Sequence, residues 1–203
     1  MISFESIFQR HRFMAVLRGL PARQAVEAAQ RAWDLGIELV EVPIGDLSMV
    51  DALGAVVEAA RERGKTVGAG TVITSDHVQA ARDAGAAYTV APGLDPDVLA
   101  ASTTAGLPHL PGVATPSEVQ QAWRLGCQWV KVFPAATLGP DWFRAIRGPF
   151  PTLRYVATGG ITPCTASAYL EAGADIVAVG TAVTNPSHHN RLAELLRQYT
   201  PAP

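Results

Sequence analysis

Glycine recurs through this chain at intervals that divide it into repeating units. Seven glycines stand shortly before apolar, strand-like runs and lie 20 to 28 residues apart: Gly36, Gly64, Gly85, Gly106, Gly126, Gly148 and Gly173. All but Gly148 end an amphipathic stretch rich in Ala, Arg or Leu. Glycine is favoured just past a helix end because it readily adopts the left-handed conformation. The chain is therefore predicted to repeat one unit of helix, strand and two short loops.

The apolar runs predict eight strands, at 13–17, 37–42, 66–70, 88–92, 109–112, 129–133, 154–159 and 175–180. The fifth, HLPG, is flanked or interrupted by prolines, so its assignment depends partly on the regular spacing. Strands that alternate with helices predict a parallel sheet, either open and doubly wound or closed into a barrel, and eight regular units favour closure. The expected fold class is α/β: a single (β/α)8 TIM barrel over 1–203, with an extra N-terminal helix at 2–11 that caps its bottom and a last helix at about 187–198.

The length and net charge of the chain limit the number of domains and the kinds of partner that we expect. A chain of 203 residues suffices for one sizeable core and is short for two. A net charge of −2 gives no reason to expect nucleic acid or an acidic membrane surface as partner. We see no apolar run of signal-peptide or membrane-helix length, and Cys127 and Cys164 lack zinc or redox spacing, so a cytoplasmic protein with reduced thiols is expected.

Two charged residues stand inside apolar strands. Lys131, one of only two lysines, lies in WVKVF, and Glu41 lies in LVEVP. Because side chains alternate along a strand, the flanking valines of each run share one face and the charged residue takes the other. The valines suit packing against helices, so Lys131 and Glu41 are both expected to point into the barrel.

Such a pair favours a catalytic use over a structural one. Desolvation costs several kcal/mol per ion, so a buried pair is a weak stabiliser. A lysine removed from water is more readily a neutral amine, which attacks ketones. An ionised carboxylate nearby would oppose that effect, so we expect Glu41 to act through a water or a substrate hydroxyl, without tight contact to Lys131.

Small residues follow the last two strands, where these barrels bind phosphate. The seventh strand runs into Thr158, Gly159 and Gly160, and the eighth ends in Gly180 and Thr181. Glycines let backbone amides approach a ligand, and Thr162-Pro163 resembles the N-cap and first turn of a helix. A phosphate site is favoured over two simple tight turns.

The carboxyl ends of the first and third strands carry further candidates. Arg18 follows the first strand and suits bidentate binding of a carboxylate, and Thr71 follows the third and offers a hydroxyl to the same group. An ordinary loop role remains an alternative for each.

At these residues the sequence resembles the family of 2-keto-3-deoxy-6-phosphogluconate (KDPG) and 4-hydroxy-2-oxoglutarate (KHG) aldolases, which includes the 6-phosphogalactonate enzymes. The resemblance spans nearly the whole chain. It rests on AVLRGL, LVEVP, VGAGTV, APGL, LPGVATPSE, VKVFPA, LGP and TGGI, in this order.

The resemblance implies a cofactor-free class I aldolase of the Entner–Doudoroff type. It implies that Lys131 forms a Schiff base, that Glu41 is the general acid/base, and that Arg18 and Thr71 hold the carboxylate. Phosphate would lie among Gly159, Gly160, Gly180 and Thr181, next to Thr158. The expected substrate is KDPG, which is cleaved to pyruvate and glyceraldehyde 3-phosphate. A homotrimer is also implied.

Three further residues are expected to form walls of the site, and the sequence differs from the family pattern at one position. Pro92, Trp129 and Phe133 are expected as walls, although plain core packing suits the two aromatic residues better. Some members carry an arginine four residues after the glutamate, where this chain has Gly45. We expect Arg18 to bind the carboxylate instead, and the departure leaves open whether KDPG, its galactonate epimer or KHG is preferred.

Two other functions stay open at this point. The same barrel suits a phosphosugar isomerase, epimerase or synthase with Glu41 as base, or a non-catalytic binder of phosphometabolites. A metal-dependent aldolase is not expected, since the five histidines show no multi-ligand spacing at strand ends.

Overall fold

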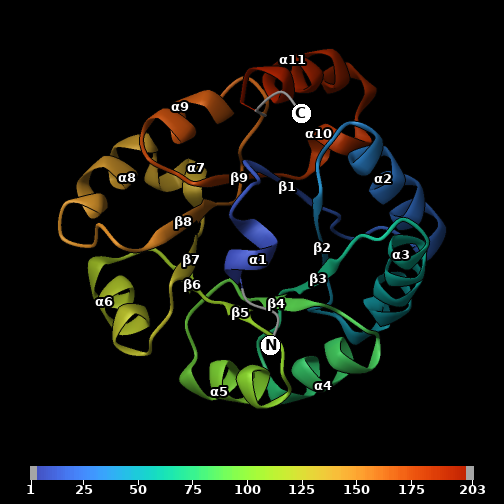
Figure 1. Cartoon of the computed structure of the whole chain (residues 1–203), viewed down its shortest axis with the longest axis horizontal. Coiled ribbons are helices and arrows are strands. Elements are labelled where there is room, and N and C mark those ends of the chain that lie inside the picture. The colour runs from blue at the N-terminus through green and yellow to red at the C-terminus, as the bar shows by residue number, and fades with distance from the viewer. Residues whose placement is uncertain (1–3, 200–203) are drawn as a thin grey trace.

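The computed structural model describes residues 4–199, and its strands form one ring (Figure 1). The strands are β1 (Phe13–Val16), β2 (Leu39–Pro43), β3 (Val67–Gly70), β4 (Tyr88–Val90), β5 (His109–Leu110), β6 (Gly112–Val113), β7 (Trp129–Val132), β8 (Arg154–Ala157) and β9 (Ile176–Val179). All pairs are parallel, in the spatial order β5-β4-β3-β2-β1-β9-β8-β7-β6. The predicted α/β barrel is thus confirmed, in close to the expected strand positions.

The fifth predicted strand is split, which corrects the expectation of one strand at 109–112. Thr89 of β4 pairs with His109, whereas Lys131 of β7 pairs with Gly112. Pro111 lies between them, has no N–H for a ladder, and accepts a 2.8 Å hydrogen bond from the Lys131 N–H. The chain therefore changes partner strand at Pro111, and this short link closes the ring.

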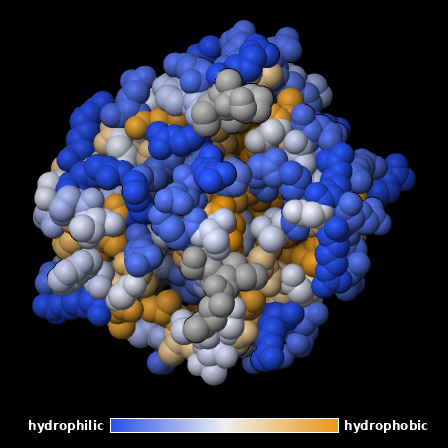
Figure 2. Space-filling view, in the orientation of Figure 1, coloured by the Kyte–Doolittle hydropathy of each residue, from blue (hydrophilic) through white to orange (hydrophobic). Residues whose placement is uncertain are grey.

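Helices cover the outside of the ring (Figure 1). They are α2 (Ala22–Asp34), α3 (Val50–Glu62), α4 (Ser75–Asp83), α5 (Pro96–Thr104), α6 (Pro116–Arg124), α7 (Ala135–Leu138), α8 (Pro140–Arg147), α9 (Ala166–Glu171), α10 (Thr181–Thr184) and α11 (His189–Tyr199), with 3₁₀ turns at Leu47–Met49 and Pro186–His188. Figure 2 shows that their outward surfaces are mainly hydrophilic, with hydrophobic side chains in the gaps between them. Within residues 4–199, no helix has the length and apolar character that a bilayer crossing requires.

The predicted helix-ending glycines behave as expected. Positive φ angles occur at Gly36, Gly64, Gly85, Gly106, Gly126 and Gly173, whereas Gly148 follows α8 with a φ of −57°. Glycine tolerates this left-handed backbone without the steric penalty of a Cβ.

A short helix closes the amino-terminal end of the barrel. Helix α1 (Phe4–Phe8) lies across the ring in Figure 1, and the fully buried Phe8 ring lies 5.3 Å from both the Tyr88 and the Trp129 ring centroids. The predicted cap is confirmed in place but is shorter than 2–11, of which residues 2 and 3 lie outside the described part. The opposite end, where the strands terminate, stays available for a site.

Candidate active site

A cavity of about 480 Å³ lies at the carboxyl ends of the strands. All eight residues predicted to bind substrate line it: Arg18, Thr71, Pro92, Thr158, Gly159, Gly160, Gly180 and Thr181. They come from the loops after β1, β3, β4, β8 and β9, which the ring brings together. The lining also includes Thr162, which the sequence offered as a helix N-cap, and residues that the sequence did not single out: Val16, Leu17, Leu20, Ile161, Ala178 and Thr184.

Lys131 and Glu41 meet inside the barrel. The side chain of Lys131 is 2% exposed and that of Glu41 is fully buried, and Lys131 Nζ lies 3.5 Å from Glu41 Oε1. Strands β2 and β7 are not neighbours in the ring, so the pair spans its interior. The flanking Val40, Val42, Val130 and Val132 belong to the outer core, as alternation predicted.

The pair is close without a hydrogen bond. The 3.5 Å separation exceeds hydrogen-bond length but is within ion-pair range, and neither Glu41 oxygen accepts a hydrogen bond from any residue of 4–199. The absence of a tight contact agrees with the expectation from the sequence. Glu41 therefore keeps its acceptor capacity for a ligand or a water.

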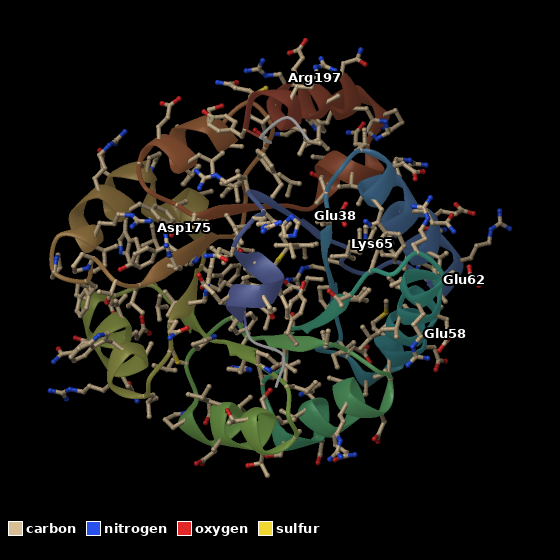
Figure 3. The ribbon with its side chains drawn as sticks, viewed as in Figure 1. Glu38, Glu58, Glu62, Lys65, Asp175 and Arg197 are labelled. Atoms are coloured by element: carbon tan, nitrogen blue, oxygen red, sulfur yellow. The ribbon has the colours of Figure 1, made fainter. Side chains whose placement is uncertain are left out.

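The other lysine has a different environment. Lys65 pairs with Glu38 at a partly exposed position, and Figure 3 shows the two side chains close together beside the barrel. Such exposed pairs contribute little to stability and suggest no chemistry. Asp175, also labelled there, is by contrast buried; it pairs with Arg147 and Arg154 and accepts a hydrogen bond from the Tyr155 N–H at 2.9 Å, which is a structural network.

Phe133 connects the buried lysine to the cavity. Its ring lies 5.6 Å from Lys131 Nζ and also lines the cavity, whereas neither Lys131 nor Glu41 is itself part of the lining, so Phe133 lies between the buried amine and the cavity. Of the expected walls, Pro92 and Phe133 line the cavity, whereas Trp129 packs on Phe8 at the other end. Core packing is thus the role of Trp129.

Glycines in β3 make room for the buried side chains, a contribution that the sequence reading missed. A Cβ on Gly70 would lie 2.1 Å from Glu41 Oε1, and one on Gly68 would lie 2.0 Å from Tyr88 Cε2. Burial, and secondarily the charge of Glu41, raise the pKa of Tyr88 well above its ordinary value. Tyr88 therefore stays neutral, and its hydroxyl donates to the Val40 carbonyl at 3.0 Å. The signal available was the alternation of glycine in VGAG.

The loop after β8 is fixed by its backbone. Gly159 and Gly160 have φ angles of 99° and 73°, and the Ala135 and Ala136 N–H groups of α7 donate to the Thr158 and Gly159 carbonyls at 2.8 and 3.0 Å. Thr158 Oγ1 is buried without a hydrogen-bond partner in the described chain. Thr158, Gly159 and Gly160 all line the cavity, so this constrained loop forms part of its wall.

The predicted helix start at Thr162-Pro163 is wrong by a few residues. Helix α9 begins at Ala166, with Thr165 before it. The Thr162 carbonyl accepts hydrogen bonds from the Thr165 and Ala166 N–H groups, both at 3.0 Å. A hydrogen-bonded turn therefore precedes the regular helix.

Arg18 and Thr71 reach the cavity from the loops after β1 and β3. Arg18 is exposed, forms no hydrogen bond or ion pair with any described residue, and is the single arginine or lysine on the described cavity wall. Thr71 has a φ of 57°, and among described non-glycine residues it alone has a positive φ. A β-branched residue in this region is strained, and such strain gathers at functional sites.

Comparisons with known proteins identify the family of this chain. The sequence profile of the KDPG and KHG aldolases matches residues 4–197. A probable 2-dehydro-3-deoxy-6-phosphogalactonate aldolase of Rhizobium meliloti is 31% identical over 174 residues, 85% of this chain and 82% of its own length. The KHG/KDPG aldolase of Escherichia coli is 34% identical over 169 residues, 83% and 78% of the two chains.

A solved structure agrees with both. The KDPG aldolase of Legionella pneumophila, captured with pyruvate as a covalent carbinolamine intermediate, superposes with a TM-score of 0.83 at 27% identity and covers 97% of each chain. Since profile, relatives and fold coincide over nearly the full length, this chain belongs to the KDPG and KHG aldolase family and is an aldolase.

Proposed function

We propose that the chain is a class I aldolase in which Lys131 forms a Schiff base with a 2-keto-3-deoxy sugar acid. The single observation that carries this proposal is the buried Lys131 amine, 3.5 Å from a buried carboxylate and next to the Phe133 ring that lines the cavity. The Legionella protein supports it, because a carbinolamine is the adduct of an amine with a carbonyl carbon. Family membership disfavours the isomerase and the binding-only alternatives.

The reaction follows from the two groups. Lys131 Nζ attacks the C2 ketone as the neutral amine, and loss of water leaves an iminium that accepts electrons. Glu41, through a bound water, removes the C4 hydroxyl proton, and the C3–C4 bond breaks to give an aldehyde and the enamine of pyruvate. Glu41 then returns a proton to the enamine carbon, and hydrolysis releases pyruvate.

The cavity wall supplies the two anion sites of the proposal. Arg18 has no partner in the described chain and binds the carboxylate bidentately, with the Thr71 hydroxyl as a second donor. Backbone N–H groups of Gly159, Gly160, Gly180 and Thr181 bind phosphate, next to Thr158, and Pro92 forms a wall of the site. The substrate thus lies with its C2 carbon above Lys131.

KDPG is the proposed substrate, with pyruvate and glyceraldehyde 3-phosphate as products, in the Entner–Doudoroff route. The second candidate is the galactonate epimer, because the Rhizobium meliloti relative is named for it; unphosphorylated KHG is the third. Comparing kcat/KM for the three donors distinguishes them. We further propose one catalytic domain over 1–203, a cytoplasmic location and a homotrimer, each following the family resemblance, without cofactor or metal.

Borohydride trapping tests the chemistry. Borohydride added with pyruvate should attach a reduced pyruvyl group, and peptide mass spectrometry should place it on Lys131. The matched control is Lys65→Met, which removes the chain's other lysine and should leave the adduct unchanged, whereas Lys131→Met should abolish adduct and turnover. An adduct that survives Lys131→Met, or no adduct in the parent, would overturn the mechanism.

A further inference from the structure

Gly45 and Thr71 lie side by side just beyond two neighbouring strands. Pro43, the last residue of β2, pairs with Gly70, the last of β3, and the Ile44 N–H donates to the Gly70 carbonyl at 2.8 Å. Gly45 follows Ile44, and Thr71 follows Gly70. The strand register therefore fixes how closely these two approach.

No room remains for a side chain on Gly45. A Cβ built there would lie 2.5 Å from Thr71 Cγ2 and 3.2 Å from Thr71 Cβ. Carbon atoms in contact normally stand about 3.5–4.0 Å apart. Either Thr71 or the loop after β2 must move to admit even a methyl group.

Thr71 has little freedom to give way. Its φ of 57° is a conformation that β-branched residues rarely adopt, and branching at Cβ makes its χ1 angle stiff. Its methyl faces Gly45, so its hydroxyl, on another branch of Cβ, points away from Gly45. Thr71 also lines the cavity. The orientation of the hydroxyl at the cavity wall thus depends on the empty space at Gly45.

We propose that Gly45 is a positioning residue: its missing side chain holds the Thr71 hydroxyl in the direction that binds the substrate carboxylate. This inference rests on the proposed function, in which Thr71 and Arg18 bind that carboxylate. It also means that this chain cannot add a cationic side chain at position 45 without displacing Thr71. Recognition of the carboxylate is thereby left to Arg18 and Thr71 together.

A double-mutant cycle tests whether the effect of a side chain at position 45 depends on the Thr71 methyl group. The variants are Gly45→Ala, Thr71→Ser and the double variant, because serine keeps the hydroxyl but lacks the methyl that meets the new Cβ. The readouts are the pyruvate concentration for half-maximal borohydride trapping and the maximal trapping rate. Gly54→Ala in α3 is the control, since a Cβ there has nothing within 4 Å and should change neither.

The expected result is specific to the carboxylate end. Gly45→Ala should raise the half-maximal pyruvate concentration at least tenfold and leave the maximal rate within about threefold, since Lys131 is untouched. In the Thr71→Ser background the same alanine should raise it less than threefold. Thermal unfolding of all four proteins shows whether each is folded, and the double variant keeps the test decisive if Gly45→Ala alone unfolds.

The other outcomes have separate meanings. Equal losses from Gly45→Ala in both backgrounds, with a normal parent adduct at Lys131, overturn the positioning role and leave the proposed function standing. Absence of the parent adduct overturns the proposed function, and this inference fails with it. Unchanged trapping in Gly45→Ala also overturns the inference.

Discussion

Removing Lys131 should destabilise this protein more than removing it together with Glu41. In Lys131→Met, Glu41 stays fully buried, with no hydrogen bond to its oxygens from residues 4–199 and no counter-charge 3.5 Å away. In Lys131→Met/Glu41→Leu both charges are replaced by apolar groups of similar size. The comparison isolates the desolvation of one carboxylate.

The distance between Lys131 Nζ and Glu41 Oε1 sets the size of the expected change in the free energy of unfolding. At 3.5 Å and an effective dielectric constant of about 20, the pair attracts by about 5 kcal/mol, whereas desolvation costs several kcal/mol for each ion. The pair therefore contributes about nothing to net stability. Losing only the lysine should lower the free energy of unfolding by about 3–5 kcal/mol, and replacing both residues should be neutral or stabilising by about 1–4 kcal/mol.

Urea unfolding measures these differences through the midpoint, with the slope checked for constancy. A loss of about 3–5 kcal/mol corresponds to a fall in Tm on the order of 10 °C for a chain of this size. Protein concentration is held fixed across variants, because assembly would shift apparent stability. The reasoning is refuted if Lys131→Met is as stable as the parent, or if the double variant is less stable than the single one.

Three further predictions follow from other positions. Gly70→Ala should lower kcat by roughly 10²–10⁴, because the new Cβ would lie 2.1 Å from Glu41 Oε1 and so displace the carboxylate; a parental kcat would contradict this. Burial lowers the pKa of His109 to about 4, below the ordinary 6.5, so stability is present above about pH 6.5 and is lost toward pH 4. Urea unfolding above pH 6.5 and near pH 4 measures this effect. Acidification should lower the free energy of unfolding of the parent by on the order of 3 kcal/mol more than that of His109→Asn. Finally, thiol reagents at pH 8 should modify exposed Cys164 at least tenfold faster than Cys127, whose pKa burial raises to about 11; equal rates by mass spectrometry would refute it.

The barrel and the inward direction of Lys131 could be predicted because they depend on local periodicity. Alternation within WVKVF and LVEVP separates the valines from the charged residues, and no tertiary information is needed for that step. The glycine spacing likewise marks the helix ends, whose left-handed backbone is a local property. The parallel direction and the order of the strands then follow from the general behaviour of repeated helix–strand units.

The remaining features depend on contacts between distant segments. The break at Pro111 follows from its change of partner from β4 to β7, which no spacing within HLPG indicates. The clearance at Gly70 depends on the Glu41 side chain of β2 and that at Gly45 on the Thr71 side chain just beyond β3, and the strained φ of Thr71 depends on its surroundings. Sequence patterns named Thr71 as a site residue but not its backbone conformation.

The interior of a small barrel is filled by side chains, so each polar group there takes space from apolar packing. Strand β3 lacks a side chain at two positions, and the space is filled by its neighbours: the ring of Tyr88 lies against Gly68 and the carboxylate of Glu41 lies against Gly70. Without the second glycine, Glu41 would not extend toward Lys131 across the ring. The strand thus makes room for an aromatic ring on one neighbour and for a buried carboxylate on the other. Phe8 packs edge-on against the Tyr88 ring, so these two residues add apolar packing to the interior, whereas the Lys131–Glu41 pair contributes about nothing to net stability.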